Sequence, residues 1–466
     1  MIYSNLEFLI FFTIIFTLYW LTNARSRVYV LLGASYLFYA SWNAKFLALI
    51  LSSTLLDYVV GLKIQNAPKH HQKKWLLLSL IGNLGVLATF KYFDFFIVSF
   101  SELADLLGFT VSPHTLRLVL PVGISFYSFQ SMSYTIDIYR GQIDACRSLP
   151  RFMLYVAFFP QLVAGPIVRA RDILGQFANP PFFNPSLLVS GGRRFLLGFV
   201  QKALLADQAA IVVDEVFASP VQYSTGMLWI SVVLYALQIY WDFAGYSNMA
   251  RGIARMLGYE LPTNFDFPYL AGSIREFWRR WHMTLSTWLR DYLYIPLGGS
   301  RGKELRVHFN LMVTMLLGGL WHGASWTFVI WGGYHGLLLC IYRYGHGRRW
   351  WGIERCNRSV WLTNKITTFF LVCVGWVWFR AESLEDALLI FRGMFWLTPG
   401  DTYLLGLSII LLITGLFYHL ALPPLLRCMK KMNVAPVWSG LAYACLIAFL
   451  IVFTPFEIQR FIYFQF

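Results

Sequence analysis

Long apolar stretches recur along the whole chain and constrain its fold more than any other feature. A helix needs roughly 20 apolar residues to cross the hydrocarbon core of a bilayer. Stretches of suitable length cover residues 6–24, 45–62, 75–100, 117–137, 186–206, 226–247, 322–342, 364–380, 403–421 and 437–454. Shorter ones near 28–41, 152–168 and 307–320 are candidates to cross, re-enter or pack inside. We therefore expect a bundle of about eleven transmembrane helices.

These stretches show no alternation of apolar and polar residues, which favours helices over the strands of an outer-membrane barrel. The chain is 58% hydrophobic with a mean hydropathy of +0.56, more apolar surface than a soluble protein of this length can bury. No small-residue cleavage site follows the first stretch, so we expect it to remain as an anchor. The prediction is an all-α polytopic membrane protein in which residues 1–466 form a single transmembrane domain.

The net charge of +15 comes mostly from basic residues in short loops, a pattern typical of cytoplasmic loops rather than of nucleic-acid binding. We assign the basic loops at 25–27, 63–74, 140–151, 343–358 and 427–431 to the cytoplasm and the acidic segments 101–105 and 381–386 to the outside. Both termini then face outward. The last residues, Phe461-Ile-Tyr-Phe-Gln-Phe466, are too few to span and form an external aromatic tail that should dock into this protein or a partner.

Two histidines in apolar, aromatic surroundings are the first candidates for chemistry. His322 lies among Gly318, Gly319 and Gly323, which permit close approach by a substrate, and beside Trp321. An ionisable group inside a membrane is a functional-site hypothesis by default. A neutral imidazole can accept a proton from a hydroxyl that attacks a thioester and return it to the leaving thiolate, which suits acyl transfer.

His282 lies in the segment Arg279-Arg-Trp-His-Met-Thr-Leu-Ser-Thr-Trp-Leu-Arg290. On a continuous helix, Trp278, His282 and residues 284–286 would approach one face. His282 could orient an acyl donor or acceptor, or it could be a structural histidine bonded to a carbonyl. The other histidines are read as solvated (His70, His71, His114, His346) or as hydrogen-bonded structural residues (His308, His335, His419).

A group of basic residues surrounds these histidines on the predicted inner side. Guanidinium groups bind phosphate well, so they could hold the phosphates of a coenzyme A donor, although each could equally be an ordinary basic residue of an inner loop. The group comprises Arg275, Arg279, Arg280, Arg290, Arg301, Lys303 and Arg306. Asp57, Asp137 and Asp242 lie inside apolar segments, where pairing with an arginine is expected.

Other kinds of site have no support in the sequence. No GxSxG elbow, HExxH, phosphate-binding loop or GxGxxG occurs, so the motifs of serine hydrolases, zinc proteases, NTPases and dinucleotide enzymes are missing. The six cysteines form no CxxC pair, and we expect neither a disulfide framework nor a metal site.

Several blocks of the sequence resemble the membrane-bound O-acyltransferase (MBOAT) family, and within it the bacterial alginate O-acetylation branch. The blocks are specific because they occur in the family's order. They are Phe159-Pro-Gln-Leu-Val-Ala-Gly-Pro-Ile-Val-Arg169, Tyr240-Trp-Asp-Phe-Ala-Gly-Tyr-Ser247, Phe277-Trp-Arg-Arg-Trp-His-Met-Thr-Leu-Ser286, Asp291-Tyr-Leu-Tyr-Ile-Pro-Leu-Gly-Gly299 and Leu320-Trp-His-Gly323.

The resemblance implies a helical bundle, with re-entrant or interfacial helices, around a central tunnel. It implies that His322 is the essential histidine and that His282 occupies the family's second, less universal polar position. It also implies that Tyr463 in the aromatic tail carries the acyl group, although the tail could instead only seal a helix end. We expect Arg279, Arg280, Arg290, Trp278 and Trp321 to contact the donor, acetyl-CoA, with no metal.

The predicted function is transfer of acetyl from cytoplasmic acetyl-CoA across a bacterial inner membrane toward an exported polysaccharide such as alginate or cellulose. The expected partners are a periplasmic acetyltransferase or esterase-like protein, the polysaccharide synthesis machinery and membrane lipids. Two alternatives remain open. One is a transporter or flippase of an acylated intermediate; the other is an acyltransferase acting on peptidoglycan, a lipid or a protein.

Overall fold

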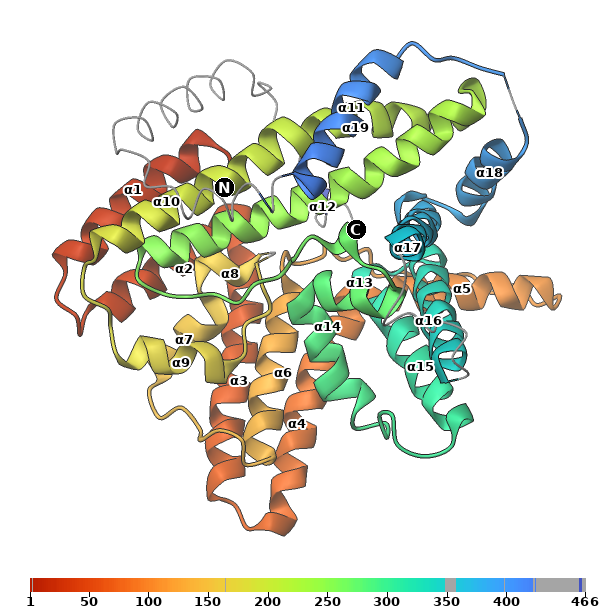
Figure 1. The fold of residues 1–466 in the computed structure, drawn as a ribbon. Helices are drawn as coiled ribbons and strands as arrows, with labels where there is room; N and C mark the ends of the chain where they lie inside the picture. The colour runs from red at the N-terminus through yellow and green to blue at the C-terminus, as the bar shows by residue number, and fades with distance from the viewer. Residues whose placement is uncertain are drawn as a thin grey trace, which may run out of the picture. The chain divides into compact units, whose positions relative to one another are not determined.

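The computed structural model describes residues 1–421 apart from Ile2, Ala164, residues 348–357 and Thr398, and in addition Pro424, Phe461 and Ile462. Its helices are α1 (Leu6–Leu21), α2 (Arg27–Asn43), η1 (Ala44–Phe46), α3 (Leu47–Asn66), α4 (Lys69–Leu87), η2 (Ala88–Tyr92), α5 (Phe93–Leu106), α6 (Ile124–Tyr139), α7 (Leu149–Ala157), α8 (Phe159–Leu162), α9 (Ala170–Ala178), α10 (Pro185–Phe199), η3 (Val200–Ala206), α11 (Asp207–Ala218), η4 (Pro220–Gln222), α12 (Thr225–Met256), η5 (Pro268–Leu270), α13 (Ile274–Arg280), α14 (Met283–Leu289), η6 (Arg290–Tyr294), α15 (Glu304–His322), α16 (Trp326–Gly347), α17 (Arg358–Arg380), α18 (Leu384–Phe395) and α19 (Leu405–Leu420) (Figure 1).

The prediction of an all-helical membrane protein is confirmed. The described residues contain no strand, only an isolated bridge between Tyr223 and Asp401. Within them, five helical runs are long and apolar enough to cross a membrane, and two shorter apolar helices accompany them. The runs are Arg27–Asn66, Lys69–Leu106, Pro185–Ala218, Thr225–Met256 and Trp361–Arg380; the shorter helices are Leu6–Leu21 and Leu405–Leu420. The count of eleven stays a prediction, and the expected helix at 437–454 lies outside the described residues.

One predicted span is shorter than its apolar stretch. Residues 117–137 were expected to be helical throughout, but α6 begins only at Ile124. Gly123 precedes it with φ +75°, a left-handed conformation that favours glycine. A Cβ atom at Gly123 would lie 2.7 Å from the carbonyl oxygen of Leu162, so the close approach of that backbone also requires glycine.

The chain divides into two compact units. Unit 1 comprises Met1–Leu196 and Tyr246–Thr263, and unit 2 comprises Leu197–Gly245 and Asn264–Phe466. Each unit is therefore built from segments that are far apart in sequence. The expectation of one transmembrane domain over residues 1–466 stays a prediction.

In unit 1, α3, α4 and α6 lie side by side and enclose a buried carboxylate (Figure 1). Asp57 of α3 is fully buried. Its Oδ1 accepts a hydrogen bond from Ser79 at 2.6 Å and its Oδ2 accepts one from Asn83 at 2.8 Å, both from α4. Ser53 donates to Asn83, which extends the network. The arginine expected beside Asp57 is therefore replaced by neutral donors.

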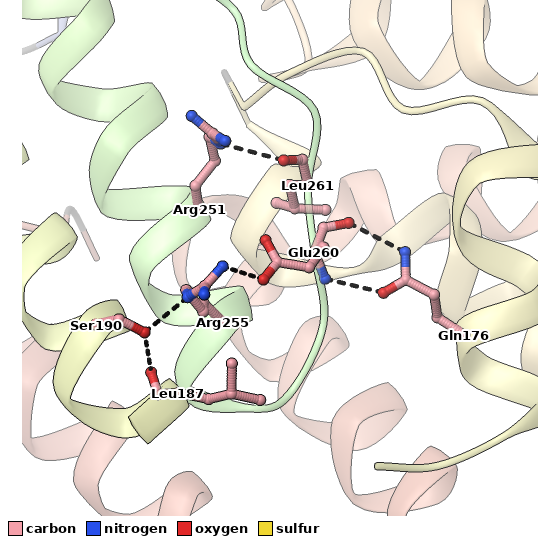
Figure 2. Close-up of polar contacts among 7 residues, drawn as sticks. All are labelled: Gln176, Leu187, Ser190, Arg251, Arg255, Glu260 and Leu261. Atoms are coloured by element: carbon pink, nitrogen blue, oxygen red, sulfur yellow. Dashed lines mark hydrogen bonds and ion pairs between the residues drawn. The ribbon is translucent and has the colours of Figure 1, made fainter. Parts of the chain in front are cut away.

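A second polar network in unit 1 fixes the loop that follows α12, as Figure 2 shows. Arg251 donates to the carbonyl of Leu261 at 3.1 Å, and Arg255 forms an ion pair with Glu260. The backbone of Glu260 both accepts from and donates to the side-chain amide of Gln176. The loop is thus tied to α9 and α12 before the chain enters unit 2 at Asn264.

In unit 2, α15 and α16 form a closely packed hairpin (Figure 1). A Cβ atom at Gly319 would lie 2.2 Å from the carbonyl oxygen of Phe328, and one at Gly332 would lie 2.3 Å from that of Met315. Glycine at these positions lets the two backbones approach as closely as small residues allow in membrane helix pairs. This packing fixes where α15 ends, and α15 ends at His322.

Candidate functional site

His322 is the last residue of α15, and an aromatic box surrounds its ring. The centroid of the imidazole lies 5.0 Å from that of Trp321, 5.0 Å from that of Trp331 and 5.1 Å from that of Phe379. All three contacts are edge-to-face, and His322 is only 4% exposed. Gly323 follows with extended backbone and ends the helix. The imidazole therefore occupies a nearly dry site with fixed walls.

His282 lies at a break between two short helices, which corrects the expectation of one continuous helix. α13 ends at Arg280, α14 begins at Met283, and His282 between them has φ 40° and ψ 55°. Asn264 stabilises the break. Its Oδ1 accepts hydrogen bonds from the backbone N–H and hydroxyl of Thr284, and its carbonyl accepts one from the N–H of Met283. These bonds satisfy donors in the first turn of α14 that a helix end leaves open.

The same contact determines the tautomer of His282. Nδ1 of His282 lies 3.1 Å from Oδ1 of Asn264. Because the backbone N–H of Thr284 can only donate, the atom that it faces must be the amide oxygen of Asn264. His282 therefore donates through Nδ1, and the lone pair is on Nε2. Burial lowers the pKa of His282 well below its ordinary value, so the ring is neutral at physiological pH.

The two candidate histidines share one aromatic wall. The ring of Trp321 lies 6.0 Å from that of His282 and 5.0 Å from that of His322. The ring of Phe243 of α12 also contacts His282, with the two centroids 4.7 Å apart. Although forty residues separate His282 from His322 in sequence, the fold brings them to one place in unit 2. Trp321 contacts both rings.

A cavity of about 1120 Å³ lies beside this box, within unit 2. Its mouth is exposed at Arg275, Arg279, Arg290 and Glu304, while Met315 at its inner end is buried. The lining comes from α13, α14, η6, α15 and α16. It includes Arg275, Trp278, Arg279, Met283, Ser286, Thr287, Leu289, Arg290, Tyr294, Ser300, Glu304, His308, Leu311, Thr314, Met315, Leu339, Tyr342, Arg343 and Tyr344.

The basic residues around this cavity differ in whether they form ion pairs with carboxylates. Arg290 lines the cavity but is paired with Asp291 at 2.6 Å. Arg343 pairs with Glu304 at 2.8 Å. Within the described part of the chain, Arg275 and Arg279 form no ion pair, and both line the cavity at its exposed mouth. A cavity with an apolar interior and a cationic mouth fits a ligand with a phosphate-rich end and a less polar end.

Arg280, which was expected at the donor site, is absent from the cavity lining. It pairs with Glu276 one turn earlier on α13 at 2.8 Å and lies 3.7 Å from Asp266. Trp321 is also absent from the lining and contacts the rings of both histidines instead. Of the residues expected to contact a donor, Trp278, Arg279 and Arg290 line the cavity.

One face of α15 runs from the cavity to His322. The lining residues Glu304, His308, Leu311 and Met315 follow helical spacing, and seven residues, about 10 Å, separate Met315 from His322. His322 itself does not line the cavity. The ring of Trp278, which does, lies 5.7 Å from that of Trp331, and Trp331 contacts His322. The rings of Trp278 and Trp331 therefore connect the lining of the cavity to the imidazole.

The remaining residues predicted from the sequence lie outside this cavity or outside the described residues. Tyr463 lies outside the described residues.

Asp242 is paired with Lys202 at 2.8 Å and not with an arginine. Within the described residues no group of three or more His, Cys, Asp or Glu side chains is arranged to hold a metal ion. Sequence reasoning missed Asn264 and the Glu304–Arg343 pair, and only the proximity of Asn264 to an aromatic block hinted at a role.

Comparison with known proteins identifies the family. The family model described as MBOAT, membrane-bound O-acyltransferase family, matches residues 28–379. A probable alginate O-acetylase AlgI from Azotobacter vinelandii is 44% identical over 85% of this chain and 78% of its own length. A peptidoglycan O-acetyltransferase from Helicobacter pylori is 40% identical over 78% of this chain and 72% of its own length. A teichoic acid D-alanyltransferase from Bacillus subtilis is 28% identical over 59% of this chain and 71% of its own length. The chain belongs to the membrane-bound O-acyltransferase family and is a multi-pass membrane O-acyltransferase.

Proposed function

We propose that the protein takes an acetyl group from cytoplasmic acetyl-CoA and passes it across the inner membrane toward an exported polysaccharide, with His322 as general base. The observation that carries this proposal is the face of α15, which lines a cationic cavity at one end and presents a buried imidazole at the other. Relatives at 42–44% identity carry the name alginate O-acetylase, which supports a polysaccharide as acceptor.

The donor is proposed to bind with its phosphates at the cavity mouth. Arg275 and Arg279 are the cations without a carboxylate partner among the described residues there, so they would bind the phosphates most strongly, with Arg290 contributing less. The thioester end would point toward the aromatic layer of Trp278 and Trp331. Movement of these two rings would bring the thioester carbon to His322.

The chemical step is general base catalysis. His322 accepts the proton of an acceptor hydroxyl while the hydroxyl oxygen attacks the thioester carbon. The carbon–sulfur bond then breaks, and the imidazolium returns the proton to the departing coenzyme A thiolate. The aromatic walls exclude water, which would otherwise hydrolyse the thioester. His282, neutral and held by Asn264, is proposed to position the acceptor.

We propose Tyr463 as the first acceptor. A phenol with a pKa near 10 is a slow nucleophile at neutral pH and needs a base, which His322 would supply. The acetylated tyrosine would then face outward, where a periplasmic transferase passes the acetyl group to the polymer. This route assigns the tail to the periplasmic side, as the charge distribution of the loops predicts.

The test is transfer or hydrolysis of labelled acetyl from acetyl-CoA by purified protein. His322→Ala should lower the rate by about 100-fold to 10,000-fold, the usual contribution of a positioned general base. His419→Ala is the matched control, since His419 is a 6% exposed histidine among aromatic rings of unit 2 that contacts Tyr240 and Tyr269. Full activity in His322→Ala, with the protein folded and present at normal levels, would exclude His322 as the base.

A further inference from the structure

Lys202, Asp207 and Asp242 form a buried ion cluster in unit 2. Nζ of Lys202 lies 2.8 Å from Oδ1 of Asp207 and 2.8 Å from Oδ1 of Asp242. The three side chains are between 2% and 4% exposed. Buried carboxylates are unfavourable in an apolar interior unless cations or hydrogen-bond donors reach their oxygens, so each donor to this cluster contributes to its stability.

The local backbone explains how Lys202 reaches both carboxylates. Lys202 and Asp207 are five residues apart and would lie on different faces of a regular α-helix. The π-helical segment η3 covers Val200–Ala206, and the N–H of Asp207 bonds to the carbonyl of Lys202. Wider π turns of this kind are often found at functional sites. Asp242 is contributed by α12.

The additional donor comes from a distant part of the chain. The backbone N–H of Ile462 donates to Oδ2 of Asp242 at 2.7 Å, and 220 residues separate the two. Hydrogen bonds to a carboxylate are shorter and stronger than those between neutral groups. Ile462 is 4% exposed and Phe461 is 1% exposed, so both side chains are buried.

The segment Phe461–Ile462 packs against the wall of the candidate site. The ring of Phe461 lies 5.6 Å from that of Phe243, and Phe243 lies 4.7 Å from the ring of His282. Phe243 directly follows Asp242 in sequence. Neighbouring residues of α12 therefore hold the segment through a charge-assisted hydrogen bond and an aromatic contact.

We propose that Asp242, held in place by Lys202, is a positioning residue that anchors the segment Phe461–Ile462 beside the His282 wall. Tyr463 follows Ile462 directly in sequence, so the anchor would set where the proposed acyl carrier begins; that consequence alone rests on the proposed function. Asp207 shares Lys202 with Asp242, whereas the N–H of Ile462 donates to Asp242.

A matched pair of variants tests the anchor. Asp242→Ala and Asp207→Ala each leave Lys202 paired with one carboxylate, so the cluster keeps the same charge in both. Only Asp242→Ala removes the acceptor of the Ile462 N–H. Hydrogen–deuterium exchange at the Ile462 amide, measured by mass spectrometry on the full chain, should become about tenfold or more faster in Asp242→Ala, and should stay near the wild-type rate in Asp207→Ala. Equal exchange rates in the two variants would overturn the proposal.

A second pair of variants probes the same hydrogen bond from its donor end. Ile462→Pro removes the N–H donor, whereas Ile462→Ala keeps it and removes only side-chain packing. Exchange at the Phe461 amide should rise more in Ile462→Pro than in Ile462→Ala. If Ile462→Ala matches or exceeds Ile462→Pro, side-chain packing rather than Asp242 holds the segment, and the anchor is refuted.

Activity separates the anchor from the proposed function. With the anchor lost, polymer acetylation should fall while the KM for acetyl-CoA stays unchanged, because the cavity is intact. If exchange shows release of the segment but acetylation stays at the wild-type level, the anchor stands and the carrier role of Tyr463 fails. If exchange is unaffected, the anchor fails whatever happens to acetylation.

Discussion

Units 1 and 2 each bury polar groups among apolar helices, but they surround these groups differently. In unit 1, Asp57 is satisfied by Ser79 and Asn83, neutral donors from the neighbouring helix. In unit 2, His282 and His322 are walled by aromatic rings and lie beside a cavity with a cationic mouth. Burial of a polar group is therefore not sufficient to identify a site. In unit 2, a ligand-sized cavity lined by arginine side chains lies beside the buried histidines, and this cavity is what marks the candidate site.

The largest effect expected from this difference between the two units is on donor binding. Arg279→Gln should raise the KM for acetyl-CoA by about tenfold or more, because Arg279 lines the cavity without a carboxylate partner among the described residues. Arg290→Gln should raise it less, since Asp291 already neutralises Arg290. Arg280→Gln is the control off the cavity. Steady-state kinetics with acetyl-CoA measures all three, and a larger effect from Arg280 than from Arg279 would contradict this assignment.

The next effect is on stability and concerns unit 1. Asp57→Ala leaves Ser79 and Asn83 without the acceptor that they share, and should destabilise the protein by about 1–3 kcal/mol. Thermal unfolding in detergent measures this change. Acetyl transfer per folded molecule should stay at the wild-type level. A specific loss of transfer in folded Asp57→Ala would show that the polar network of unit 1 also takes part in catalysis.

The smallest effect is a pH dependence of stability in unit 2. Burial lowers the pKa of His282 in the folded state, so the unfolded chain binds the proton more readily as the pH falls below about 6.5. His282 therefore makes the wild type less stable as the pH falls, by at most about 1.4 kcal/mol per pH unit. Thermal unfolding of His282→Gln between pH 7 and pH 5 should show a shallower dependence. Identical slopes would mean that His282 titrates normally.

Hydropathy and residue clustering predicted the helical membrane class and brought attention to His322 and His282. The break at His282 could not be predicted, because it depends on Asn264, a residue 18 positions away that supplies the bonds of a helix cap. The sequence also could not predict which arginines line the cavity and which form ion pairs. Arg279 and Arg280 are adjacent in sequence, yet one lines the cavity and the other pairs with Glu276. Partners of this kind are set by tertiary packing rather than by local pattern.

The family assignment also narrows the alternatives. Membership in the membrane-bound O-acyltransferase family supports bond-making chemistry and leaves the transporter reading without support. The family does not identify the acceptor, since the names of the relatives refer to alginate, peptidoglycan and teichoic acid. Three proposals are therefore independent of one another: the donor site at the cavity, the polysaccharide acceptor and the carrier role of Tyr463. Each has its own test.

The most direct test of the central proposal is an electron cryomicroscopy structure of the full chain with a non-hydrolysable thioether analogue of acetyl-CoA. We predict phosphate density at Arg275 and Arg279, and the thioether end of the analogue beside His322, with room for one acceptor hydroxyl between them, after Trp278 and Trp331 have moved apart. An analogue bound away from this cavity, or bound in it with its thioether end turned toward the mouth at Glu304, would contradict the account.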